Sequence, residues 1–128
     1  MFELGKAYRR LEVMDLLGVP DEISRTGGAW FTGYARHESA ICVFCNVGNA
    51  GRTGHNYSNR WVGQSLQWYG NGQSRADQPF INDMINGSHQ VHVFWRAKDR
   101  DPFIYAGVGH PQEVSGKEPV GITWSFPG

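Results

Sequence analysis

Two cysteines stand three positions apart, and this C-x-x-C spacing is typical of zinc sites and of redox-active disulfides. Cys42 and Cys45 fall in the run 40–45, which is rich in β-branched and aromatic residues and therefore predicts a strand. Positions three apart on a strand face opposite sides of the sheet, so a shared metal or a disulfide is hard to form. No second cysteine pair is present to complete a zinc finger. We expect two buried core thiols.

The five histidines raise the question of a metal site or a general base. The sequence has no H-E-x-x-H motif and no H-N-H nuclease scaffold, and His89 and His92 have an odd spacing on a predicted strand. It also lacks a Walker loop, a G-x-G-x-x-G loop and a G-x-S-x-G elbow. We therefore expect a protein without catalytic residues, bound metal or cofactor.

Arginines and aromatic rings carry the strongest chemical signal. There are nine arginines against three lysines, and 13% of the residues are aromatic. Arginine suits phosphates and guanine edges and stacks on rings, although a formal net charge of zero does not by itself indicate a nucleic-acid binder. Adjacent aromatic pairs, Trp30–Phe31 and Trp68–Tyr69, are expected to place one ring on each face of a strand. Outward rings beside arginines are typical of proteins that read extruded bases.

Short elements must position these side chains, because 17 glycines and 6 prolines are spread along the 128 residues. Apolar spacing predicts a helix over 8–18, ended by Gly18, and a second over 77–85, capped by Asp77. A turn at 99–102 is expected to join two of the strands. The strands are predicted at 29–34, 40–45, 65–69, 89–95, 103–106 and 120–126. The chain is thus expected to be one α+β domain, 1–128, with a curled, barrel-like, mostly antiparallel sheet and about two short helices.

Two irregular stretches are candidates for ligand contact. The glycine-rich segment 46–55 is the longest of them, and long loops in compact domains are often functional. Residues 70–75, Gly-Asn-Gly-Gln-Ser-Arg, fit an anion-holding turn and fit a plain turn equally well.

Scattered positions over 2–126 resemble domains of modification-dependent (type IV) restriction systems. The residues that carry the resemblance are Phe2-x-x-Gly-Lys-x-Tyr-x-Arg, Gly27-Gly28, Phe44-Cys-Asn-Val-Gly48, Tyr57-x-x-x-Trp61, Trp68-Tyr-Gly-Asn-Gly-Gln73, Ile81, Val91-His-Val-Phe-Trp-Arg96 and Phe103-Ile-Tyr-Ala-Gly107. They resemble the sulfur-binding domain of HNH restriction enzymes that attack phosphorothioated DNA. They also resemble the related domain at the end of restriction-type helicase-nucleases. Both groups are similar to the PUA/SRA β-barrel fold.

The resemblance implies a specificity domain that binds modified double-stranded DNA and is not itself an enzyme. It implies a nuclease or helicase effector, fused or separate, in the cytoplasm of a prokaryote. Sulfur-binding domains have a proline in an apolar pocket just after the Gly-Gly pair, whereas residues 30–34 read Trp-Phe-Thr-Gly-Tyr here. Backbone phosphorothioate and a flipped modified cytosine such as 5-methylcytosine are therefore both open.

Two groups of residues are expected to contact such DNA. The modification pocket is expected to comprise Trp30, Thr32, Tyr34, Tyr57 and Trp68. Contacts to phosphates and base edges are expected from Arg36, His37, Arg52, His55, Asn56, Arg60, Gln73, Ser74 and Arg75.

Two other function classes remain open. One is a PUA-like RNA-binding module, which would prefer single strands or 2′-hydroxyl contacts. The other is a small hydrolase that uses a histidine with a carboxylate such as Asp77 or Asp83. The charged N-terminus lacks the apolar core of a signal peptide, and no apolar run approaches the roughly 20 residues of a membrane span, so a cytosolic location is expected.

Overall fold

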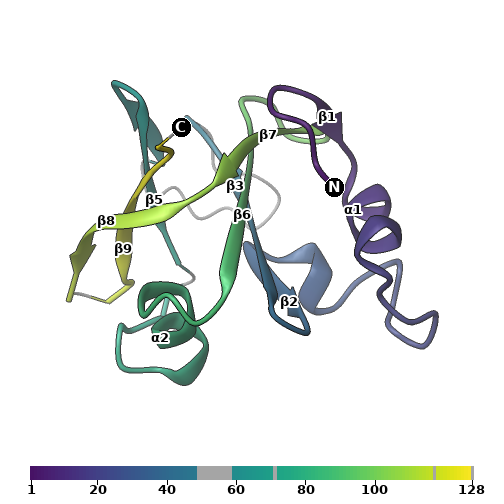
Figure 1. Cartoon of the computed structure of the whole chain (residues 1–128), viewed down its shortest axis with the longest axis horizontal. Helices are drawn as coiled ribbons and strands as arrows, with labels where there is room; N and C mark the ends of the chain where they lie inside the picture. The colour runs from purple at the N-terminus through teal and green to yellow at the C-terminus, as the bar shows by residue number, and fades with distance from the viewer. Residues whose placement is uncertain (49–58, 71, 117, 128) are drawn as a thin grey trace.

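The computed structural model describes residues 1–48, 59–70, 72–116 and 118–127, and Figure 1 shows the arrangement of their elements. In chain order the elements are β1 (Ala7–Tyr8), α1 (Arg10–Leu17), the 3-10 helix η1 (Ala29–Phe31), β2 (Tyr34–His37), β3 (Ala40–Asn46), β4 (Arg60–Val62), β5 (Ser65–Tyr69), α2 (Pro79–Ile85), β6 (Gln90–Arg96), β7 (Phe103–Val108), β8 (His110–Ser115) and β9 (Gly121–Ser125). The predicted α+β class is confirmed.

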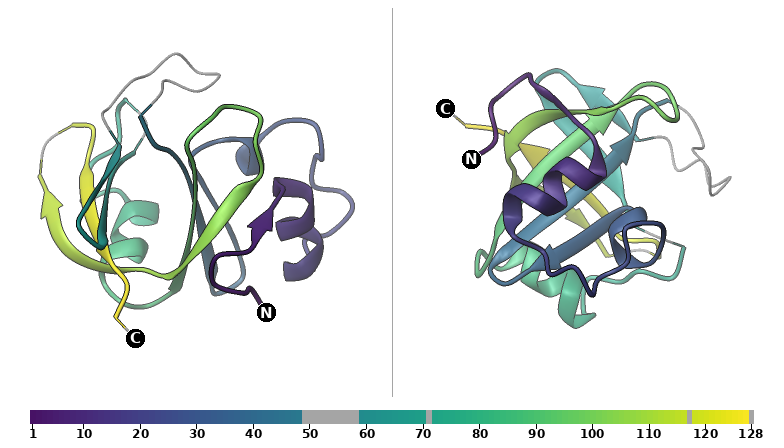
Figure 2. Two further views of the ribbon diagram at one scale, coloured as in Figure 1. Left: turned by 90° about the horizontal axis from the view of Figure 1, so that it is seen from above. Right: turned by 90° about the vertical axis from the view of Figure 1, so that its right-hand side faces the viewer.

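The strands form two sheets that curl around a shared core. The five-stranded sheet has the order β1-β7-β6-β3-β2 and the four-stranded sheet the order β4-β5-β9-β8. All pairs are antiparallel except β3 with β6. The four-stranded sheet and α2 lie on one side of the five-stranded sheet and α1 on the other (Figures 1 and 2). This is the predicted curled, mostly antiparallel architecture.

Alternation along β3 separates two hydrophobic cores, one on each face of the five-stranded sheet. Ile41, Val43 and Cys45 pack against the four-stranded sheet and α2, while Cys42 and Phe44 pack on the α1 side. Both cysteines are buried and free, as expected, and they point to opposite faces.

The two sheets are joined where β7 continues into β8 through Gly109. A Cβ at this glycine would lie 2.8 Å from both Val93 Cγ2 and Trp124 Cε3, so the bend leaves no room for a side chain. The Gly109 amide donates to the Val91 carbonyl at 2.8 Å. A close approach of backbone to core side chains thus determines how tightly the sheet curls.

Replacing this glycine tests the bend. We expect Gly109→Ala to lower the free energy of unfolding by about 1–3 kcal/mol, because the added methyl overpacks a buried contact between two side chains. Chemical denaturation followed by tryptophan fluorescence measures the change. Gly116→Ala is the matched control, since a Cβ there meets nothing within 4 Å and the effect should be near zero. Equal effects for the two variants would contradict the explanation.

Several local predictions were wrong. Residues 29–31 form η1 and not a strand, because Gly28 takes a φ of 82° and its carbonyl accepts from the Phe31 amide at 3.0 Å. This turn drives the Trp30 side chain into the core. Helix α2 begins at Pro79 after Gln78, and no side-chain hydrogen bond caps it. The short strands β1 and β4 were missed, as was β8, whose Pro111 borders a bulge on an edge strand.

The predicted end of the first helix is confirmed, because α1 is capped by Gly18, whose φ of 76° is left-handed. Its predicted start at residue 8 was wrong, since Tyr8 pairs with Phe103 in β1 and the helix begins at Arg10. Among the described residues, neither helix is long and apolar enough to cross a membrane.

Candidate nucleic-acid interface

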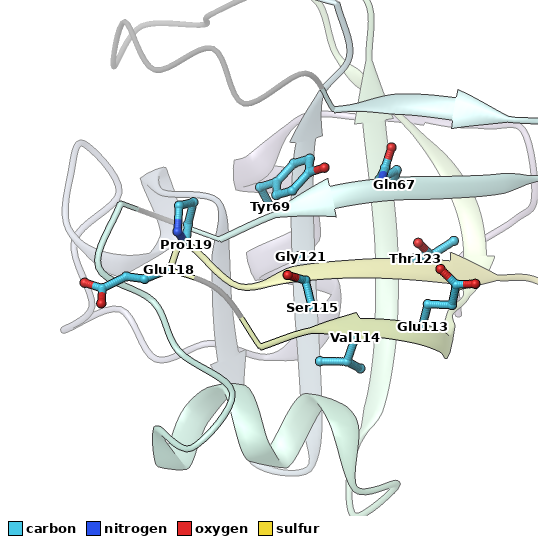
Figure 3. A pocket seen from close by; sticks show the side chains of 9 residues that line it. All are labelled: Gln67, Tyr69, Glu113, Val114, Ser115, Glu118, Pro119, Gly121 and Thr123. Atoms are coloured by element: carbon cyan, nitrogen blue, oxygen red, sulfur yellow. The ribbon is translucent and has the colours of Figure 1, made fainter.

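A hollow lies on the outer face of the four-stranded sheet. Alternation along β5 sends Leu66 and Trp68 into the core and turns Gln67 and Tyr69 outward. The hollow has a volume of about 490 Å³, and Figure 3 shows its side chains. It is lined by Gln67, Tyr69, Glu113, Val114, Ser115, Glu118, Pro119, Gly121 and Thr123. We call this the sheet hollow.

An aromatic platform forms part of the sheet hollow. Tyr69 pairs with Gly121 across β5 and β9, and a Cβ on Gly121 would lie 2.9 Å from Tyr69 Cε1 and 3.2 Å from Cδ1. The ring therefore lies over the glycine backbone, where no other residue type leaves room for it. The Tyr69 amide also donates to Asn59 Oδ1 at 3.0 Å, which holds the backbone below the ring. A half-exposed ring fixed in this way can stack against a flat ligand.

Polar groups surround the platform. Register pairing aligns Arg60, Gln67, Thr123 and Glu113 in one row across β4, β5, β9 and β8. Arg60 Nε donates to Gln67 Oε1 at 3.2 Å, so a guanidinium stands at one end of the row and a carboxylate at the other. The hollow thus combines a ring face, a carboxylate acceptor, an amide and a hydroxyl. A flat heterocycle that bears both hydrogen-bond donors and acceptors, such as a nucleobase, matches these groups.

The aromatic residues predicted for the pocket occupy other places. Trp30 and Trp68 are 3% and 1% exposed and belong to the cores on opposite faces of the five-stranded sheet. Tyr34 packs edge-on against Trp68 with ring centroids 5.6 Å apart. Thr32 donates its hydroxyl to the Ala29 carbonyl at 2.7 Å. These four residues do not enclose one open pocket, and Tyr57 lies outside the described residues.

The arginines predicted to contact phosphates differ in whether their side chains already pair with a carboxylate of the protein. Arg36 forms an ion pair with Asp83 at 2.6 Å and lies 4.7 Å from the Phe80 ring centroid, so it joins β2 to α2. Arg75 pairs with Asp77 at 3.1 Å. Arg60 lies in the polar row beside the sheet hollow, and Arg52 lies outside the described residues.

The remaining predicted contact residues are spread over the surface and the core. His37, the last residue of β2, has its Nε2 3.8 Å from the Glu38 carboxylate and does not line the sheet hollow, and Gln73 is exposed. Ser74 is buried, and its Oγ accepts from the Val120 amide at 3.2 Å, which holds the start of β9. His55 and Asn56 lie outside the described residues.

Comparison with known protein families identifies the family of this chain. A family model described as a domain of unknown function, DUF3427, matches residues 2–126. The chain belongs to the DUF3427 family. No curated protein matches its sequence.

Two solved structures share the fold of this DUF3427 domain. One is the SUVH5 SRA domain in complex with hemi-methylated CG DNA, with a TM-score of 0.59 and 14% identity over 99% of this chain and 90% of that chain. The other is Arabidopsis thaliana SUVH6 in complex with SAM, with a TM-score of 0.54 and 14% identity over 99% of this chain. The DUF3427 domain spans about a quarter of that SUVH6 chain, 26%. The chain therefore has the SRA-like fold that its sequence predicts.

The cysteines of the DUF3427 domain have the environment of core residues. Burial raises the pKa of the Cys42 thiol to about 12 and also raises that of Cys45. Among the described residues, no group of three or more His, Cys, Asp or Glu side chains is placed to hold a metal ion.

His92 and the Tyr105 hydroxyl form a hydrogen bond of 2.8 Å, and burial lowers the pKa of His92, which favours its neutral form.

Thiol titration tests this assignment. At about pH 8 we expect Cys42 and Cys45 to be unreactive toward Ellman's reagent in the folded protein, because the thiolate is the reactive form and burial disfavours it. Both should react once the protein is unfolded in guanidinium chloride. Rapid reaction of either thiol in the native state would contradict a purely structural role.

Proposed function

We propose that this domain binds modified double-stranded DNA and receives a modified base, rotated out of the helix, in the sheet hollow. The observation that carries the proposal is the Tyr69 ring lying on Gly121, within a polar hollow of about 490 Å³. The SRA-like fold supports it, because the SUVH5 SRA domain, which has the same fold, was solved in complex with hemi-methylated CG DNA.

The lining of the sheet hollow favours a cytosine derivative over the backbone phosphorothioate that the sequence left open. A carboxylate accepts a hydrogen bond from the cytosine amino group, and Glu113 and Glu118 both supply one. The same carboxylates repel a negatively charged thiophosphate. A stacked base with one or two such bonds fits the hollow better than a backbone group.

Contacts to the DNA backbone are expected to supply the larger part of the binding free energy. Stacking on an aromatic ring contributes about 1–3 kcal/mol, and rotating a base out of the duplex costs a few kcal/mol. The two nearly cancel, so arginine contacts to phosphates must supply the remainder and binding should weaken steeply with salt. Arg60 stands at the end of the polar row and is placed to take a phosphate next to the rotated nucleotide.

We also propose that the domain acts in a restriction system that targets modified DNA. A domain that binds and does not cut needs a nuclease or helicase effector, fused or separate, and the resemblance to type IV restriction systems agrees with such a role. A pull-down from the source cell with modified duplex on beads identifies the effector.

A competition experiment tests the ligand. Fluorescence polarisation is measured with matched duplexes that carry cytosine, 5-methylcytosine, 5-hydroxymethylcytosine, N6-methyladenine or a phosphorothioate linkage, and with single-stranded RNA. We expect a preference for a modified-cytosine duplex of about tenfold or more, which corresponds to about 1.4 kcal/mol. Equal binding to all duplexes would contradict modification reading, and a preference for RNA would support the PUA-like alternative.

The carboxylate at the end of the polar row gives a specific prediction. Glu113→Gln replaces an ionised acceptor by a neutral amide of the same size. We expect about tenfold weaker binding of the preferred duplex, because a hydrogen bond to a charged group contributes about 1.5–3 kcal/mol. Glu22→Gln is the control, since Glu22 is exposed, lies outside the hollow and carries the same charge. Equal effects of the two changes would show that only total charge matters.

A further inference from the structure

A second hollow, of about 400 Å³, lies between the start of α1 and the turn that joins β6 to β7. We call it the arginine hollow. It is lined by Arg9, Arg10, Leu11, Phe31, Arg96, Asp99, Arg100, Asp101 and Phe103. Four arginines therefore face two aspartates, which leaves an excess of two positive charges in a chain whose formal net charge is zero.

Two of these arginines are fixed parts of its wall. Both guanidinium groups lie over the Phe103 ring, that of Arg10 at 4.9 Å and that of Arg96 at 4.2 Å from its centroid. Arg10 also donates to the Thr32 carbonyl at 2.7 Å. Arg96 donates to Asp99 Oδ1 at 3.0 Å, so one of the two carboxylates is already engaged inside the wall.

The other two arginines stand at the rim. Arg9 and Arg100 are exposed, and no ion pair within the described residues involves either of them. Arg100 has a φ of 72°, which places it in the left-handed region at the turn. Arg9 is the N-cap of α1, and its backbone amide donates to Glu12 Oε1 at 2.9 Å, so the helix end is already capped and the guanidinium groups supply the positive charge.

Hydrogen bonds connect the arginine hollow to the sheet hollow. Arg96 Nε donates to Asn46 Oδ1 at 2.6 Å, Asn59 Nδ2 donates to the Asn46 carbonyl at 3.1 Å, and the Tyr69 amide donates to Asn59 Oδ1 at 3.0 Å. The chain of contacts runs from the wall of one hollow to the platform of the other. The two hollows are thus linked through Asn46 at the end of β3 and Asn59 just before β4.

From this geometry we infer that the arginine hollow is a phosphate-binding site, with Arg9 and Arg100 as the ligand-contacting residues and Arg10 and Arg96 as positioning residues. Because hydrogen bonds link the two hollows, we assign as its source a backbone phosphate of the bound DNA outside the nucleotide held on Tyr69. The identity of that source rests on the proposed function, whereas the affinity for phosphate does not.

The test compares the double variant Arg9→Gln/Arg100→Gln with Lys98→Gln in the same turn. Lys98 is exposed and carries the same charge but does not line the arginine hollow. We expect the double variant to reduce the slope of log affinity against log salt by about 2, because each neutralised phosphate contributes about 0.9 for duplex DNA. Lys98→Gln should leave the slope unchanged. Affinities for modified and unmodified duplexes should fall by the same factor.

A second arm uses inorganic phosphate as the probe and needs no DNA. In 1H–15N spectra of the wild-type protein we expect phosphate to shift the Arg9 and Arg100 Nε resonances and the Leu11 amide. The double variant lacks both Nε resonances, and its Leu11 amide should not shift. Phosphate shifts in a protein that binds no DNA would support the site and contradict the proposed function. A double variant indistinguishable from Lys98→Gln in both arms would overturn the phosphate site.

Discussion

Tyr69→Ala is expected to weaken binding of the preferred modified duplex by about 10- to 100-fold. The estimate follows from base–aromatic stacking, which contributes about 1–3 kcal/mol per base, with tenfold in affinity per 1.4 kcal/mol. Tyr69 is half-exposed on the outer face of β5, so its removal creates no core cavity. Fluorescence polarisation at fixed salt measures the affinity, and denaturation curves should show little change in stability. Affinity for unmodified duplex should fall much less, because no base enters the hollow there.

Two further variants distinguish stacking on the Tyr69 ring from a contribution of its hydroxyl to binding. Tyr69→Phe keeps the ring and removes the hydroxyl, so binding should stay within about threefold if stacking carries the effect. Gly121→Ala keeps Tyr69 but adds a Cβ 2.9 Å from its ring, which must then move. We expect Gly121→Ala to reduce affinity nearly as much as Tyr69→Ala. Full affinity in both Tyr69→Ala and Gly121→Ala would exclude the sheet hollow as the base pocket.

Phe103→Ala is expected to lower the free energy of unfolding by about 3–5 kcal/mol. Phe103 is 1% exposed, and removing a buried phenylalanine loses its transfer energy and leaves a cavity. The loss is enlarged because the ring also contacts the guanidinium groups of Arg10 and Arg96. Urea denaturation followed by tryptophan fluorescence measures the effect, and a domain of this size has little stability beyond such a loss.

Phe103→Leu is the matched control for this position. Leucine fills most of the same volume but offers no π face to the two arginines. We expect a loss intermediate between those of the wild type and Phe103→Ala, and the remaining difference reports the cation–π contacts. Should Phe103→Leu be as stable as the wild type, the ring would act through its volume alone.

Local sequence patterns determined most of the elements and the general class of the fold. Apolar spacing with Gly18 at its end predicts α1, since the helical repeat and the left-handed cap involve residues close together in the chain. Period-two alternation predicts β3 and places Cys42 and Cys45 on opposite faces. The same alternation predicts that Trp68 and Tyr69 face opposite sides. These features depend on residues close together in the chain.

Tertiary structure alone decided which residues meet at the candidate sites. Alternation cannot tell whether Trp68 or Tyr69 faces the core, because that depends on which side of β5 the five-stranded sheet and α2 cover. The sequence analysis chose Trp68 for the pocket, and the structure buries it and leaves Tyr69 outside. Gly121 and Glu113 come from strands more than 40 residues further along the chain, and their place beside Tyr69 is set by strand register. Sequence spacing carries no information on such pairing, since it arises from the packing of the whole sheet.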